Sequence, residues 1–356
     1  MKPTRLLFVG FLCAYPCFLS FDPAGDGLTF APGEGTQLTK TFTLEQEISD
    51  GEMSVSMGSK AWSIEVQGET SRSIRITDSY GSMEGSRPTL LRRRFTDGVA
   101  TIDAQSTFTS GEQSEEFQAQ GEGTSRWNDL TVIFTWDGEE EAYAKAFDED
   151  SEGEHAWLET LEEDMDLRGF LPEGPVDTQD EWNADPAVLL SFLAPGGNLQ
   201  WDLPLDDQDG PNGLDPAIYS ELRPMLADAD IEGDIVCTYA GPRETERGEF
   251  LAIEIRVDVE AFTDLTDKAQ EEYDSDELPD GMGYEIGEMA MEFHLEGKGT
   301  LLWDGKAGHL HAFEFEGETE LIVARVVSIT GHPQVIENAI RMDVPGSVRV
   351  KVNTGE

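Results

Sequence analysis

The chain has 356 residues, of which 38% are hydrophobic, and 73 Asp and Glu stand against 24 Lys and Arg, so the formal net charge is −49. This apolar content suffices for a buried core and argues against disorder throughout. The charge repels polyanions, so nucleic acid and anionic lipid surfaces are the least favoured partners. So many carboxylates are typical of a solvated surface in a salty medium; the alternative is a cation-binding role.

Residues 1–21 have the pattern of a signal peptide: Lys2 and Arg5 precede an apolar run that Pro16 interrupts. The pattern predicts export to the periplasm, the cell envelope or the extracellular space. The run is shorter than the roughly 20 residues that span a bilayer, and no later segment is as apolar, so no transmembrane segment is expected after signal removal. The cleavage site and lipid anchoring stay open. If Cys13 and Cys17 leave with the signal, the mature chain has no internal disulfide.

Residues 22–154 are predicted to form an N-terminal antiparallel β region. Trp62, Ile64 and Val66 alternate with polar residues, the period of a strand with one wet face. Further strands are expected at 72–80, 89–96, 99–109 and 129–136, the last ending in an Asp137-Gly138 turn.

Arg92, Arg93 and Arg94 form the longest basic run, and alternation directs Arg93 to the apolar face of its strand. One interpretation is that Arg93 holds an anionic group of a ligand inside a cavity. The favoured interpretation is that it pairs with a buried carboxylate of the protein.

Residues 155–228 are predicted to be a helical and loop connector that packs on the sheet. Leu158, Leu161 and Met165 have helical spacing within residues 155–167, and Asp185-Pro186 begins a second helix. Asp215-Pro216 repeats this device before a third, short helix.

The loop at 206–215 carries four carboxylates that are candidate calcium ligands: Asp206, Asp207, Asp209 and Asp215. Aligned with a calcium-binding loop, however, the first position is Leu205 and the twelfth is Pro216. The mismatch favours a solvated acidic loop, with calcium as the alternative. No other cofactor is expected.

Residues 229–356 are predicted to form a C-terminal antiparallel β region, with a strand at 250–259, a long hairpin over 284–326 and a last strand at 340–352. The expected fold class is therefore mainly β: one or more large curved antiparallel sheets, or an open barrel, with a short helical middle segment.

The register of the hairpin is predicted by placing Trp303 opposite His309. Phe313 then lies opposite Gly299 and Phe315 opposite Gly297, so that each ring covers the space a glycine leaves. The same register predicts four further pairs: Leu301 with His311, Lys298 with Glu314, His294 with Glu318, and Glu296 with Glu316.

His309 and His311 share a face in this register, as a pair of zinc ligands on one strand would require, but His294 lies on the other face and cannot complete the site. The hairpin therefore predicts a turn histidine and a half-buried histidine on an aromatic face.

Three stretches, 76–95, 170–186 and 297–318, resemble uncharacterised secreted β-rich proteins of bacterial envelopes. The related positions in the middle stretch are Leu171, Pro172, Val176, Asp180 and Trp182. The resemblance implies an exported all-β fold of unknown role. A remote similarity, of architecture alone, is to periplasmic carriers that fold a curved antiparallel sheet over helices to shelter a lipid chain.

The sequence favours an exported, non-enzymatic binding or structural protein of the cell envelope. Its expected site is a concave sheet that holds an apolar ligand or a partner protein, lined by Phe293, Leu301, Trp303, His311 and Phe313 with Arg93. One alternative is a hydrolase that uses a carboxylate pair, although no catalytic residue can be assigned because 73 acids make such pairs inevitable. Another is a calcium-stabilised protein of the adhesion type.

Overall fold

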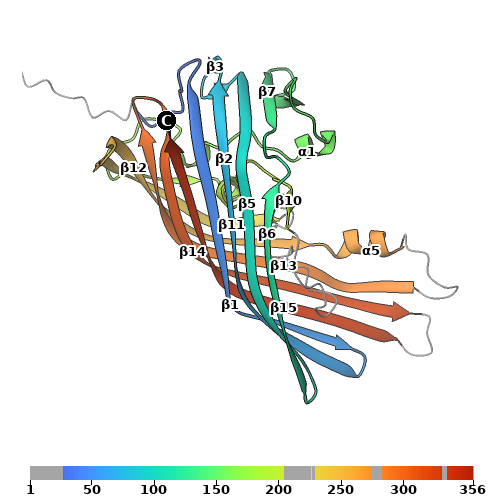
Figure 1. The fold of residues 1–356 in the computed structure, drawn as a ribbon. Helices are drawn as coiled ribbons and strands as arrows, with labels where there is room; N and C mark the ends of the chain where they lie inside the picture. Colours follow the sequence, from blue (N-terminus) through green and yellow to red (C-terminus); the bar gives the residue numbers. More distant parts are fainter. Residues whose placement is uncertain (1–26, 204–225, 227–228, 275–282, 331–334, 356) are drawn as a thin grey trace, which may run out of the picture.

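The computed structural model describes residues 27–203, 226, 229–274, 283–330 and 335–355, and these are mainly β (Figure 1). Thirteen strands form one antiparallel sheet, and β10 (Trp201–Asp202) and β9 (Glu181–Ala184), at the ends of the strand order, do not pair with each other within the described ranges. The predicted fold class, a large curved antiparallel sheet that is not closed, is confirmed. The predicted signal peptide, the candidate calcium loop and the helix after Asp215 lie outside the described residues.

The N-terminal region supplies long strands: β1 (Gln37–Met57), β2 (Lys60–Tyr80), β5 (Leu90–Ser110) and β6 (Gln113–Ser125). β3 (Met83–Glu84) and β4 (Arg87–Pro88) make a small separate hairpin, and β7 (Thr131–Asp137) pairs with β8 (Ala142–Phe147). The strands predicted at 89–96 and 99–109 are one strand, because β5 continues through an irregularity at Asp97, where φ is 51°. The predicted turn is confirmed: a side-chain oxygen of Asp137 accepts the Glu139 N–H at 2.8 Å.

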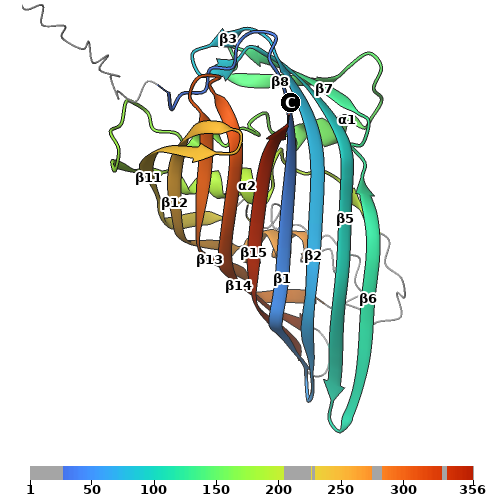
Figure 2. The same cartoon turned by 60° about the vertical axis from the view of Figure 1, so that its left-hand side comes forward.

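The C-terminal region contributes β11 (Asp230–Thr245), β12 (Gly248–Asp264), β13 (Gly283–Asp304), β14 (His309–Thr330) and β15 (Ile336–Gly355). β15 lies between β14 and β1, so the two strand-rich regions join in the middle of a single sheet (Figure 2).

Between residues 155 and 203, all of which the structure describes, the chain contains four short helices: α1 (His155–Glu159), the 3₁₀ helices η1 (Arg168–Phe170) and η2 (Pro186–Val188), and α2 (Leu189–Leu193). The helix predicted over 155–167 is therefore wrong beyond Glu159. The chain instead continues across the sheet as residues 161–170, here called the covering segment. Its first part, residues 161–167, is irregular and ends at Leu167 with a φ of 56°, and η1 completes it. The second predicted helix is confirmed, since Asp185 accepts the Ala187 N–H at 2.9 Å and the turns end before Gly196 and Gly197.

The core lies between the concave face of the sheet and this middle segment. Phe170 and Phe192 pack on Phe313 with ring centroids 5.7 and 5.9 Å apart, and Phe192 lies 5.0 Å from Phe315. All four side chains are at most 2% exposed. Burial of aromatic area of this size makes a large contribution to the stability of the fold.

The register predicted for the opposed strands β13 and β14 is two residues off. Phe315 lies opposite Gly299, Phe313 opposite Leu301 and Gly317 opposite Gly297. One residue of the shift arises at the turn, where Asp304 and not Trp303 pairs with His309. The second arises from a bulge at His311: Trp303 pairs with Leu310 and Leu302 with Ala312, which leaves His311 as the extra residue.

The faces are nevertheless as predicted, because a shift of two residues preserves the alternation. Phe315 covers both glycines: a Cβ added to Gly297 would lie 2.5 Å from its ring, and one added to Gly299 would lie 3.1 Å from it. The wet-face pairs change accordingly, so that Lys298 faces Glu316 and His294 faces Glu320, while Glu296 faces Glu318.

The edge of β13 beyond the end of β12 is covered by α5 (Thr266–Asp274). The Gln270 side chain accepts the Ile286 N–H at 2.8 Å and donates to the Tyr284 carbonyl at 3.2 Å, and Thr266 Oγ1 accepts the Met289 N–H at 3.0 Å. These bonds satisfy backbone groups that would otherwise offer a pairing edge to another chain.

Candidate functional site

The residues predicted to line an apolar site form the filled interior of the protein. Phe293, Leu301, Trp303 and Phe313 are at most 2% exposed. Phe170 of the covering segment and Phe192 of α2 pack on Phe313, and Trp303 lies 6.4 Å from Phe30 between ring centroids. The structure thus brings the predicted residues together on one face, but the chain's own side chains fill the space between that face and the middle segment. A filled interior favours a structural role for these four residues over ligand contact.

His311 lies apart from this cluster. Its ring stacks on Phe250, with centroids 3.6 Å apart and planes 6° apart, and is half-buried. Burial lowers the pKa of His311, and the nearby Arg247 adds to the shift. His309 instead donates from Nδ1 to the Leu310 carbonyl at 2.8 Å. The bulge at His311 breaks the strict alternation on which the shared-face prediction depended.

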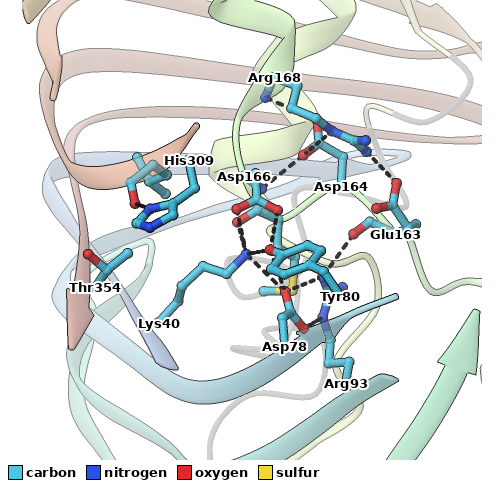
Figure 3. A network of polar contacts seen from close by, with 12 residues as sticks. Lys40, Asp78, Tyr80, Arg93, Glu163, Asp164, Asp166, Arg168, His309 and Thr354 are labelled. Atoms are coloured by element: carbon cyan, nitrogen blue, oxygen red, sulfur yellow. Dashed lines mark hydrogen bonds and ion pairs between the residues drawn. The ribbon is translucent and has the colours of Figure 1, made fainter. Parts of the chain in front are cut away.

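Arg93 is fully buried and pairs with a carboxylate, as the favoured interpretation predicted. Its guanidinium donates to both oxygens of Asp78, at 2.7 and 2.9 Å, and also to the carbonyls of Glu162 and Glu163 at 3.0 and 2.8 Å (Figure 3). Burial alone would raise the pKa of Asp78, but Arg93 and Lys40 outweigh it and lower that pKa to about 2. The guanidinium of Arg93 thus donates its hydrogen bonds to oxygen atoms of the protein itself.

Lys40 extends the same buried network from β1 to the covering segment. Its Nζ donates to Asp166 at 2.7 Å, to the Tyr80 hydroxyl at 2.8 Å and to the Met165 carbonyl at 3.2 Å, and lies 2.9 Å from Asp78. Tyr80 in turn donates to Asp166 at 2.7 Å. Two cations and two carboxylates therefore balance within a region closed to solvent, the condition under which buried charges are tolerated.

An open groove of about 1220 Å³ lies on the opposite face of the sheet. Eight strands line it, from β11 through β12, β13, β14, β15, β1 and β2 to β5. Its acids alternate along the strands with core residues: Glu45, for example, lies next to buried Leu44. The groove is therefore on the solvent side, and nine carboxylates and three cations line it: Glu45, Glu47, Glu69, Asp103, Asp234, Asp258, Glu296, Glu316 and Glu318 with Arg256, Lys298 and Arg349.

Seven of these carboxylates lie in one row that crosses the strands, which we call the acid row. Each occupies the pairing position of its neighbour on the next strand, and the order is Asp234, Asp258, Glu296, Glu318, Ser347, Glu47, Glu69 and Asp103. Only the serine interrupts the carboxylates. Like charges directly opposite each other destabilise a sheet, so five such contacts in one row are unfavourable for the fold taken alone.

All three lining cations belong to the next row, two residues along each strand. Arg256, Lys298, Glu316, Arg349 and Glu45 follow one another there as paired neighbours. The ion pairs within this row are long and exposed, 3.7 Å for Lys298 with Glu316 and 3.3 Å for Arg349 with Glu45, so they contribute little to stability. The groove as a whole keeps six more carboxylates than cations.

The acid row was missed from the sequence. Seven of the eight strands show only an ordinary acidic residue on the wet face, and the row exists because the registers of seven strand pairs bring these residues level. A signal was present in the pair Glu296 and Glu316, which the predicted register placed opposite each other; with the bulge included, Glu296 meets Glu318 instead.

Comparison with protein-family models, with curated proteins and with solved structures finds no match to this chain. Within the described residues, no helix has the length and apolar character needed to cross a membrane, and no group of three or more His, Cys, Asp or Glu is arranged to hold a metal ion.

Proposed function

We propose that the protein is an exported, non-enzymatic binding protein of the cell envelope, and that its groove binds an extended, Lys- and Arg-rich segment of a partner protein. The observation that carries the proposal is the acid row within an open groove. Neighbouring strands lie about 4.8 Å apart, so a row over eight strands extends for roughly 34 Å, which matches about ten residues of extended chain.

Charge complementarity is the reason for a cationic occupant. The acid row has five contacts between directly opposed carboxylates, and a bound cationic side chain relieves their repulsion while it gains an ion pair of its own. A protein segment suits the shape better than a compact ion, because the carboxylates are spread along a line rather than gathered around one point.

One observation supports binding rather than hydrolysis, and another supports a protein partner rather than an apolar ligand. Glu163, whose pKa burial raises to about 7, is a buried residue of the covering segment and contacts Arg168, so it is not part of an open cleft. Four of the residues predicted to hold an apolar ligand, Phe293, Leu301, Trp303 and Phe313, are buried in the core of the protein. Support for export is the pattern of residues 1–21, Lys2 and Arg5 before an apolar run.

The test is binding of a fluorescent ten-residue peptide of alternating Lys and Ser, followed by anisotropy at 50 to 300 mM NaCl. Any cationic peptide is attracted to a chain of net charge −49, so the control must hold the charge constant. One variant replaces four acid-row residues, Glu47, Glu69, Glu296 and Glu318, by Gln. Its match replaces four exposed residues outside the groove, Glu52, Glu65, Glu115 and Glu116, by Gln.

We expect the acid-row variant to lose at least tenfold in affinity and the matched variant to stay within about twofold, since only the first removes carboxylates that line the groove. Equal losses in the two variants would show that the peptide responds to net charge alone, and the groove would then not be its site. Spermidine and Ca²⁺ serve as competitors, and they distinguish a groove that requires a peptide from a groove that attracts any cation.

A further inference from the structure

The covering segment is held to the sheet by a second set of charges next to the Lys40 network, and this set does not balance. Arg168 is shared by two carboxylates of its own segment: it contacts Glu163 Oε2 and lies 3.1 Å from Asp164. It also donates to the Ser86 carbonyl at 3.3 Å, which ties the segment to the small hairpin of β3 and β4. One cation thus serves two carboxylates.

The two carboxylates differ in their other contacts. Asp164 accepts the backbone N–H of Asp166 at 2.8 Å and that of Arg168 at 3.1 Å, and its side chain is 29% exposed. The Glu163 side chain is 5% exposed, and its Oε1 is buried with no hydrogen-bond partner in the described structure. Hydrogen bonds and water favour the ionised form of Asp164, whereas the direct ion-pair partner of Glu163 is the Arg168 that Asp164 shares.

The groups that face Glu163 come from three elements. Arg168 and Asp164 belong to its own segment, Arg93 approaches from β5, and Tyr143 approaches from β8. Arg93 is already committed to Asp78, with which it forms two hydrogen bonds. The surplus negative charge therefore falls on Glu163, and a proton on this residue leaves the buried cluster neutral.

We propose that Glu163 is a proton-operated latch: when it carries a proton it holds the covering segment against the sheet, and when it ionises the segment opens at its Glu163 to Arg168 end. This inference is independent of the groove. It predicts that opening releases one proton, because an exposed glutamate ionises at lower pH than the buried one.

Hydrogen exchange of residues 161–170, corrected for the intrinsic effect of pH, measures the opening. Within this segment the N–H groups of Glu162, Asp166, Arg168 and Phe170 are hydrogen-bonded and serve as reporters. Release of one proton raises the opening constant roughly tenfold per pH unit, so we expect at least a tenfold loss of protection between pH 5.5 and 7.5 and a plateau above. Amides of β12 should not follow this change.

Glu163→Gln should keep the segment protected and remove the pH dependence of its protection. The matched control is Glu159→Gln, at an exposed position of α1: it removes the same charge and should leave the pH dependence intact. A flat profile in the wild-type protein, or an unchanged one in Glu163→Gln, would overturn the latch. If Glu163→Gln does not fold, carbon-13 NMR of the wild-type carboxyl groups decides: a glutamate that titrates near neutral pH supports the latch, and its absence refutes it.

Discussion

Lys40 Nζ lies 2.7 Å from a carboxylate oxygen of Asp166, although 126 residues separate them in the chain. This contact joins the first strand to the covering segment inside a region closed to solvent. It also makes the stability of the core depend on two charged residues, Lys40 and Asp166, which no hydrophobic pattern identifies.

Replacing Lys40 by Met should cost roughly 3 to 5 kcal/mol, because it leaves the buried carboxylate of Asp166 without its cation. Chemical denaturation measures the loss. The exposed Lys351 of β15, replaced in the same way, should change stability by less than about 1 kcal/mol. The double variant Lys40→Met, Asp166→Leu should recover part of the loss; if it is as unstable as the sum of both single variants, the pairing is not the cause.

The stability of the whole chain should depend on pH through Glu163. Burial raises its pKa from 4.5 to about 7, so the folded state binds this proton more tightly than the unfolded state does. The resulting stability is present in full below pH 4.5 and is lost as the pH rises through 7, a difference of about 3 kcal/mol.

The free energy of unfolding of the wild-type protein, less that of Glu163→Gln, isolates this effect from the other carboxylates. We expect the difference to fall steadily from pH 5 to pH 7.5. A difference that stays constant, or that grows with pH, would show that the folded carboxyl is not protonated near neutral pH.

Removal of the Phe315 ring should destabilise the fold by roughly 3 to 5 kcal/mol, because it opens a cavity over both glycines of β13. Phe262 is the matched control, since its side chain is 46% exposed and its replacement by Ala should cost less than about 1 kcal/mol. Thermal or urea unfolding of Phe315→Ala and Phe262→Ala makes the comparison, and similar losses would contradict the covering role of Phe315.

Neutralising the acid row should stabilise the protein even as it weakens peptide binding. Exchange of Glu296 and Glu318 for Gln removes a directly opposed like-charge pair, which contributes roughly 0.2 to 1 kcal/mol of repulsion. The gain should be measurable in 20 mM NaCl and should vanish near 1 M, where salt screens exposed charges. No gain at low salt would mean that the side chains already avoid each other.

The sequence was informative where one strand's own pattern decides the structure. Alternation placed Phe313 and Phe315 in the core, assigned Arg93 to a buried carboxylate and located the long hairpin. It failed where single residues matter: the turn pairs Asp304 with His309, and the bulge at His311 adds one more residue, so the pairs between the two bulges of the hairpin lie two residues from the predicted register.

The prediction for the middle segment was wrong for a different reason. Leu158, Leu161 and Met165 have helical spacing and are all buried, yet only residues 155–159 are helical. Beyond them the backbone is shaped by contacts with distant residues, such as Lys40 on Met165 and Arg93 on Glu163. Such tertiary contacts outweigh the local preference for a helix. The acid row likewise arises from contacts between strands and not from the pattern of any one strand.

The place of β15 has a consequence for how the protein folds. The strand closest to the C-terminus in the chain is inserted next to the first, so that Val352 pairs with Phe42 across more than three hundred residues. Until it arrives, β1 and β14 each present a bare edge, and the two halves are separate sheets. Because so distant a contact is slow to form, assembly should be late and concerted, and both halves need protection from wrong partners until the final strand docks.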